Sequence, residues 1–230
     1  MRSLILVAVL AAGCHRAAAP VVGPPIPTEA PVAAASPLEQ LYRARQDSAR
    51  QRFTPADVRF MAGMIGHHAQ ALAMANLAAA NAGDASIRTL AARIHNAQTD
   101  EIALMQQWLR RRDQPVPALH VDGWRVMVHG GHDAGHAAHG AMPGMLSDAQ
   151  LEALAAARGA AFDRLFLASM IAHHEGAVVM VEQLFATDGA AQDETVFKFA
   201  SDVQVDQRTE VARMRLMLAA LSDTRPPQRP

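Results

Sequence analysis

Two adjacent histidine pairs, at positions 67–68 and 173–174, are the residues of this sequence best suited to chemistry. Each pair lies inside the same phrase, which reads FMAGMIGHHAQALAM from Phe60 and FLASMIAHHEGAVVM from Phe166, an offset of 106 residues. The residues that match in register include Met64/Met170, His67/His173, His68/His174 and Met74/Met180. Neutral imidazole beside thioether suits copper, because Met selects soft Cu(I) while His accepts either oxidation state.

Helical periodicity places the histidines and methionines of each copy on one broad arc, which we expect to be the buried face. The opposite side carries small or polar residues: Gly66, Ala69, Gln70 and Ala73 in the first copy, and Ala172, Glu175 and Gly176 in the second. A buried imidazole must satisfy two ring nitrogens, and a metal ion is one partner that does so. If neutral imidazoles bind the ion, affinity is expected to fall below about pH 6.

A structural interpretation stays open beside the metal hypothesis. Histidines on an apolar helix face are often core residues that bond to a carboxylate or an amide, and methionine stripes are often core filler. Repetition of the whole constellation favours the metal more than one copy alone would.

A second repeated pattern lies on the helices that must pack against the histidine helices. Gln98 and Glu101 recur in register as Gln207 and Glu210, so the duplication covers a helix pair. Three roles are open for Glu101 and Glu210: acceptors for imidazole N–H groups, direct ligands, or surface residues paired with arginines.

The helix signals predict their boundaries. Thr54-Pro55 begins the first histidine helix and Asn81-Ala82-Gly83 ends it. Further helices are expected over 37–53, 86–112, 148–158 and 195–221, with the second histidine helix starting after Gly159. No segment alternates with the period of a strand. We therefore predict an all-α fold: a four-helix bundle made of two duplicated helical hairpins, with short additional helices and a His/Gly/Met-rich connection.

The bundle domain is expected over 38–225, with repeats at about 55–113 and 148–221 joined by a linker at 114–147. The linker offers possible accessory metal ligands: His129, His132, His136, His139, Met142 and Met145. Four of its five histidines, those from His129 to His139, are spaced as a helical stripe, but interleaved glycines make a free helix poor. Either metal orders the segment, or it is a mobile linker that binds ions weakly.

The N-terminus predicts export to the bacterial cell envelope. Residues 1–14 read as a signal peptide that ends in a lipobox-like LAAGC, which predicts lipidation of Cys14 and anchoring to a membrane facing the periplasm. An ordinary cleaved signal is the alternative. Residues 15–37 are rich in Ala and Pro and are expected to be a tether. Cys14 is the one cysteine of the chain, so no internal disulfide can form.

Charge and motifs narrow the function classes. The net charge is −1 and no basic patch stands out, so nucleic acid is not an expected partner, and no protein partner is indicated. The sequence has no P-loop, Rossmann or Ser/His/Asp signature. A ferritin-like di-metal oxidoreductase would ask for Glu-x-x-His, which does not occur here.

The double MIxHHxxA phrase, the MPGM before its second copy, and the GxxFDxxFL lead-in from Gly159 resemble the CopM-like family, catalogued as domain of unknown function number 305. The resemblance covers about Pro55 to Leu221. It implies a ferritin-like bundle, export, and binding of copper, with silver a further candidate, for sequestration, tolerance or transfer. The ligands it implies are Met64, His67, His68, Met74, Met170, His173, His174 and Met180. Because one copy reads MIGHHAQA and the other MIAHHEGA, the two sites need not be equivalent. A metal-free structural or interaction lipoprotein remains the alternative.

Overall fold

The computed structural model of the protein describes residues 36–50, 52–130 and 142–223. The predicted signal peptide with Cys14 and nearly all of the tether lie outside these residues. Three of the candidate accessory ligands lie outside them as well, namely His132, His136 and His139.

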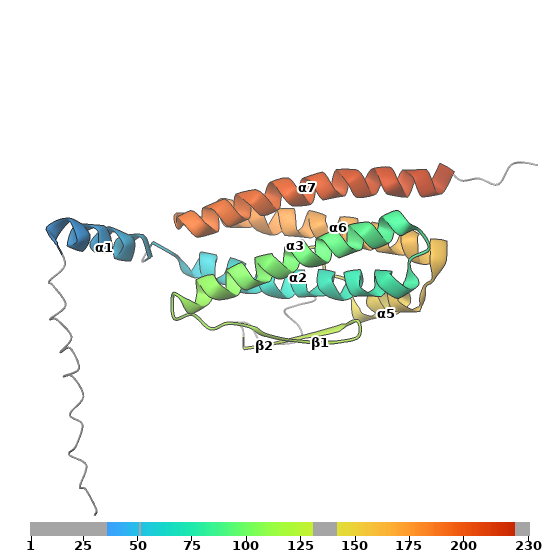
Figure 1. Cartoon of the computed structure of the whole chain (residues 1–230), viewed down its shortest axis with the longest axis horizontal. Coiled ribbons are helices and arrows are strands. Elements are labelled where there is room, and N and C mark those ends of the chain that lie inside the picture. Colours follow the sequence, from blue (N-terminus) through green and yellow to red (C-terminus); the bar gives the residue numbers. More distant parts are fainter. Residues whose placement is uncertain (1–35, 51, 131–141, 224–230) are drawn as a thin grey trace, which may run out of the picture.

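The predicted bundle of two helical hairpins is confirmed. Its helices follow the expected order and lie close to the expected bounds (Figure 1). The elements in chain order are α1 (Pro37–Arg50), α2 (Pro55–Asn81), α3 (Ala85–Arg110), β1 (Ala118–Asp122), β2 (Arg125–His129), α5 (Asp148–Ala156), α6 (Gly159–Phe185) and α7 (Glu194–Asp223). The histidine helices α2 and α6 pack against each other, and each also packs along the second helix of its own hairpin, α3 or α7.

Local signals in the sequence explain where α2 begins. The Thr54 side chain accepts from the backbone N–H of Asp57, while Asp57 accepts from the backbone N–H of Thr54, which is a capping box. The other Asp57 oxygen accepts from the backbone N–H of Ala191, 2.7 Å away in the connection between α6 and α7. The start of the first hairpin is thereby tied to the turn of the second.

The second repeat makes the reciprocal tie. Asp163, the equivalent of Asp57, is buried near the start of α6. Its two carboxylate oxygens accept from the backbone N–H groups of Gly83 and Asp84, at 3.1 and 3.0 Å, in the turn between α2 and α3. Each buried carboxylate therefore satisfies the turn of the other hairpin, which fixes the two repeats relative to each other.

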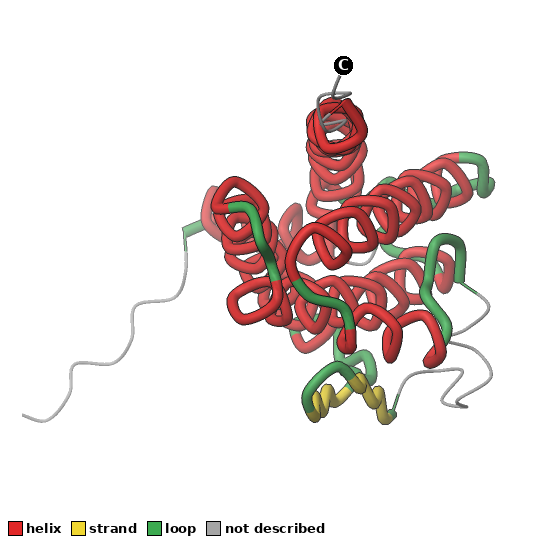
Figure 2. The backbone as a smooth tube through the Cα atoms, turned by 90° about the vertical axis from the view of Figure 1, so that its right-hand side faces the viewer, coloured by secondary structure: helices red, strands yellow, loops and turns green. Residues whose placement is uncertain are grey.

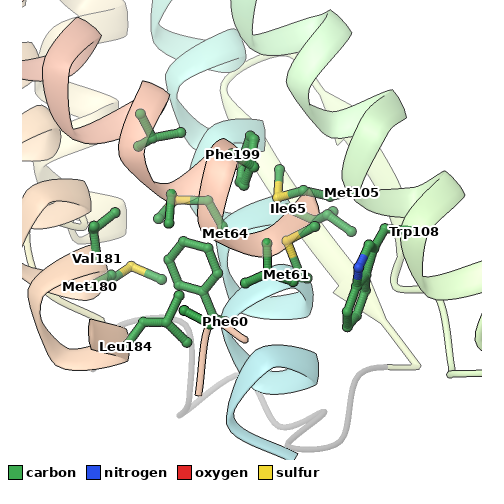
Figure 3. Packing of buried hydrophobic residues seen from close by; sticks show 14 of the residues in the cluster. Phe60, Met61, Met64, Ile65, Met105, Trp108, Met180, Val181, Leu184 and Phe199 are labelled. Carbon is green, nitrogen blue, oxygen red and sulfur yellow. The ribbon is translucent and has the colours of Figure 1, made fainter. Parts of the chain in front are cut away.

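Two apolar clusters occupy the two ends of the bundle, and each draws on all four long helices. One contains Phe60, Met64, Met105, Met180 and Phe199, and Figure 3 shows these side chains packed together. The other surrounds Met74, Phe166 and Met170 together with residues of α3 and α7. The histidine pairs lie along α2 and α6 between these clusters.

The expectation that only the histidine-bearing face of α2 is buried is wrong. Gly66, Ala69, Gln70 and Ala73 are all buried, so α2 is covered on both faces. The reason is that β1, β2 and α5 pack against α2 on the side away from α3 and α7 (Figures 1 and 2). Helix α6 fits the expectation better, because Ala172 and Glu175 are exposed, although Gly176 is buried.

The expectation that no strand occurs is also wrong. Residues 118–129 form an antiparallel hairpin in which Ala118 pairs with His129 and Asp122 pairs with Arg125. Gly123 takes a φ of 60° in the turn, a conformation that glycine adopts at little cost. His129 is therefore the last residue of a strand, and the helical stripe inferred from histidine spacing does not begin there.

Helix α6 is the one helix in the described part of the chain that is long and apolar enough to cross a membrane. In the bundle, 61% of its apolar window is buried against other elements. The central position of α6 accounts for its apolar composition.

Candidate metal centre

The four paired histidines form one cluster in the middle of the bundle. All four are fully buried, at 0% exposure. The His67 and His173 rings face each other across the contact between α2 and α6, with centroids 3.8 Å apart. The rings of His68 and His174 lie further out, with centroids 6.4 and 6.2 Å from those of His67 and His173. The two histidine pairs therefore form one cluster rather than two separate ones.

Each imidazole Nε2 atom has one hydrogen-bond acceptor. His67 bonds to the Pro143 carbonyl at 3.0 Å and His173 to the His67 carbonyl at 3.0 Å. His68 bonds to Glu101 at 2.7 Å and His174 to Glu210 at 2.6 Å. Carbonyl and carboxylate oxygens only accept, so Nε2 must carry the proton in all four rings. The protein thus fixes a single tautomer.

In a neutral ring this tautomer leaves an unprotonated lone pair on Nδ1, and burial keeps His67 and His173 in that neutral form. All four Nδ1 atoms are buried, and none has a hydrogen-bond partner. Leaving one buried acceptor unsatisfied costs about 1–3 kcal/mol, and four in one cluster is unusual for a core. A neutral imidazole nitrogen with a free lone pair is the form in which histidine binds a metal ion. The donor set therefore fits a metal ion.

Burial also keeps the central rings unprotonated. Desolvation lowers the pKa of His67 from 6.5 to about 3, and the neighbouring His68 ring lowers it further. Desolvation likewise holds the pKa of His173 well below 6.5, with His67 as the next cause. The sequence-based expectation that affinity falls below about pH 6 assumed an ordinary imidazole pKa. At His67 and His173, protons would compete with a metal ion for the imidazole only at much lower pH.

Glu101 and Glu210 take the first of the three roles considered for them. Each accepts from the Nε2–H of a histidine on the partner helix of its own hairpin. Their side chains are only 22% and 28% exposed. A carboxylate in this position holds the ring in place and increases the basicity of its other nitrogen.

The repeated methionines combine across the repeats. Met64 of α2 lies in the same buried cluster as Met180 of α6 (Figure 3), and Met74 of α2 lies in the other cluster with Met170 of α6. Met64 and Met74 are ten residues apart, or about 15 Å along one helix. Each end of the histidine cluster is therefore flanked by one thioether from each copy.

A segment that the sequence analysis treated as linker covers one side of the centre. We call residues 142–146 the strap. Gln70 holds it with two hydrogen bonds to the Leu146 backbone, of 3.0 and 2.8 Å. The Pro143 carbonyl accepts from His67, and a Cβ at Gly176 would overlap that carbonyl. The Met142 sulfur lies 3.6 Å from where a Cβ on Gly63 would stand, beside the end of Met180.

The strap explains why the two copies differ. Gln70 and Gly176 occupy equivalent positions in the two phrases, and one clamps the strap while the other makes room for it. Sequence reasoning missed these two roles. The sequence does hold a signal for them: the neighbouring His68/His174 and Ala71/Ala177 match in register between the copies, whereas this position is Gln in one copy and Gly in the other.

The remaining candidate ligands are not brought to this centre as a group. His129 is exposed at the end of β2, and Met145 is half-buried in the strap. Among the residues that the structure describes, no three His, Cys, Asp or Glu side chains stand ready to hold a metal ion. Among the described residues, histidine nitrogens alone therefore do not form a complete metal site in this conformation.

Comparisons with known proteins agree with this architecture. The family model for DUF305, a domain of unknown function, matches residues 57–218. A DUF305 protein structure from Streptomyces coelicolor is 26% identical with a TM-score of 0.60, covering 73% of this chain and 94% of that one. A DUF305 fragment from Deinococcus radiodurans is 30% identical with a TM-score of 0.59, covering 73% and 98%. No curated protein matches the chain.

CopM in its Cu(I)-bound form is also similar. It is 28% identical with a TM-score of 0.52, and the match covers 71% of this chain and 96% of CopM. CopM structures in Cu(II)-bound and Ag-bound forms match over the same shares.

Proposed function

Because this chain belongs to the DUF305 family, we propose that it binds copper ions in the bacterial cell envelope, for sequestration, tolerance or transfer and without chemical turnover. Silver, which resembles Cu(I) in its preference for soft ligands, is a second ion that such a site accepts. The proposal is supported by the similarity to CopM, which has been solved with Cu(I), Cu(II) and Ag bound.

One observation carries the proposal. Four buried Nδ1 atoms are left without a hydrogen-bond partner, in rings whose Nε2 atoms each face an oxygen acceptor. A histidine that serves only as core needs both nitrogens satisfied, because an orphaned buried acceptor is costly. A metal ion would satisfy these atoms and recover that cost.

The proposed ligands are the Nδ1 atoms of the four histidines and the thioethers at either end of the cluster. They are Met64, His67, His68, Met74, Met170, His173, His174 and Met180. Thioether and imidazole together suit Cu(I), and imidazole suits Cu(II) as well. Glu101 and Glu210 position His68 and His174 and are not proposed as ligands.

A di-metal oxidoreductase is not favoured by this arrangement. Such a site in a helical bundle uses several carboxylates as ligands. Here the two carboxylates that reach the centre are each engaged with an imidazole N–H.

Two further parts of the proposal concern segments outside the bundle core. We propose that Met142 and Met145 in the strap, with His129, His132, His136 and His139, bind additional metal more weakly than the buried cluster. We also propose that the protein is exported and anchored through a lipid on Cys14, as the LAAGC sequence predicts.

Anaerobic Cu(I) titration of the purified full chain against a competing chelator tests the proposed site. The double variant His67→Leu/His173→Leu keeps a side chain of similar size and removes two Nδ1 donors. We expect it to lose the tight class of copper, while the control His120→Leu, at an exposed histidine that is not a proposed ligand, keeps it. Circular dichroism checks that both remain helical.

Two results would contradict the proposal. Retention of no copper by the wild type would favour a metal-free structural lipoprotein. Tight binding that survives in the His67/His173 variant and is lost in a variant of the linker histidines would move the site to the linker.

A further inference from the structure

The histidine cluster has two sides that differ in their access to solvent. On one side the strap lies against α2 and α6, and it is held by Gln70, by the His67 ring and by the close approach of Gly144 to Gly176. On the other side, the outer imidazoles contact the partly exposed carboxylates of Glu101 and Glu210 on α3 and α7. On this second side, partly exposed carboxylates therefore link the buried outer rings to solvent.

Two buried glutamines lie on the same helix faces as these carboxylates. Gln98 precedes Glu101 by three residues on α3, and Gln207 precedes Glu210 by three residues on α7, so each pair shares one side of its helix. Gln98 is 2% exposed and Gln207 is 3% exposed. Both amide atoms of Gln98 and the Oε1 atom of Gln207 have no hydrogen-bond partner.

These unpartnered amides require an explanation, because a buried amide without a bond is destabilising. The same Gln stands at the same position in both repeats, beside the same Glu, so the cost is incurred twice. Amide oxygen is a neutral and weak ligand for a soft cation. It can replace water around a passing ion without holding it.

Asp206 concentrates negative charge at the outer end of this side. It lies one helical turn before Glu210 on α7. Its pKa is raised, first by partial desolvation and then by the nearby charges of Glu101, Asp202 and Glu210. Carboxylates from α3 and α7 are therefore close enough to repel one another, and such a cluster attracts cations and speeds their association.

We propose that the metal ion enters and leaves the histidine cluster between α3 and α7, attracted by Asp206 and passed inward along Gln98 and Gln207. This inference rests on the proposed copper-binding function. It assigns to these three residues a role in the rate of exchange, distinct from the ligands that determine affinity. The strap, in contrast, closes the opposite side.

Stopped-flow loading of the full chain with Ag(I), in nitrate buffer without chloride, tests the route without a carrier complex. Asp206→Lys changes the charge at the entrance by two units, and we expect loading to slow roughly fivefold at low salt, for charges about 8 Å apart in water. The difference should shrink as salt rises. The matched control, Asp188→Lys in the exposed connection before α7, makes the same change of net charge and should load like the wild type.

Gln98→Leu and Gln207→Leu test the inner part of the route. Leu has a similar size and offers no oxygen to the ion. Loading and release are both expected to slow by the same factor, so that the dissociation constant stays within about twofold. A ligand, in contrast, would change the dissociation constant itself.

The proposal is overturned if Asp206→Lys and Asp188→Lys slow loading equally, or if the Gln variants leave both rates unchanged. Faster loading of Gln70→Leu, in which the strap is released, would place the entrance under the strap. A wild type that takes up no Ag(I) would refute the proposed function itself, which is a different outcome from uptake with unchanged rates.

Discussion

The metal-free protein should lose stability on mild acidification because of its buried histidines. The folded protein holds His67 with a pKa of about 3, whereas an unfolded chain has an ordinary imidazole with a pKa of about 6.5. Unfolding therefore takes up a proton at any pH between these values. Lower pH favours the unfolded state, and the loss begins near pH 6.5 and levels off below about pH 3.

The size of the effect follows from the same two pKa values. For each pH unit below 6.5 at which folded His67 stays unprotonated, the free energy of unfolding falls by about 1.36 kcal/mol. The free energy of unfolding is therefore about 2 kcal/mol lower at pH 5 than at neutral pH because of His67. His173, whose pKa is also well below 6.5, adds to this loss. Such a change is large against a typical domain stability of about 5–15 kcal/mol.

Urea unfolding of the metal-free full chain at pH 7 and pH 5, followed by circular dichroism, measures this difference. His67→Gln removes the titrating ring and should reduce the loss between the two pH values by about 2 kcal/mol, equivalent to about 1 M urea in the midpoint. His120→Gln replaces an exposed histidine of β1 and should leave the loss unchanged. If His67→Gln keeps the full dependence of the wild type, the cluster is not excluding protons as described.

Three further predictions concern the strap, the carboxylates and the N-terminus. Gly176→Ala should destabilise the protein by about 1–3 kcal/mol in urea unfolding, because the new Cβ overlaps the Pro143 carbonyl. The control Gly63→Ala, whose Cβ meets only flexible methionine ends, should be neutral or stabilising by up to about 1 kcal/mol. Equal effects of the two substitutions would contradict the strap contact. Glu101→Gln should weaken Cu(I) binding about 10–100-fold in chelator competition, and Glu152→Gln, at an exposed position of α5, should not; unchanged affinity in Glu101→Gln would contradict its positioning role. Cys14→Ser should shift the protein from the membrane fraction to the soluble fraction or leave it unprocessed, and a wild type that is wholly soluble would argue against the lipid.

Much of the fold could be predicted from the sequence because its signals are local and repeated. The Thr54 cap, the glycine stops and the helical period fix the helices within a few residues. The duplication indicates two hairpins, and the repeated Gln and Glu positions indicate which helices face the histidines. The burial of all four histidines was likewise predictable, because they share the apolar arc of each helix.

The remaining features depend on partners that a periodic pattern does not identify. The helical period of apolar residues shows which face of α2 is apolar, but it does not show that β1 and β2 cover the other face. The period also does not show that Met64 packs with Met180 of the other copy, because that contact follows from the antiparallel packing of α2 against α6. The β hairpin is hard to predict because its two strands are five residues each, and their apolar alternation is too short to stand out from the surrounding His- and Gly-rich segment.

Nitrogen NMR of the histidine rings tests the central claim most directly. Long-range proton–nitrogen spectra of the full chain, assigned with single histidine substitutions, report the protonation of each Nδ1 and Nε2 before and after addition of Ag(I). We predict that His67, His68, His173 and His174 start as Nε2–H tautomers, that their Nδ1 signals shift on Ag(I) binding, and that their Nε2 atoms stay protonated. Unmoved Nδ1 signals in these four rings, with shifts confined to other histidines, would contradict the assignment of the buried cluster as the metal centre.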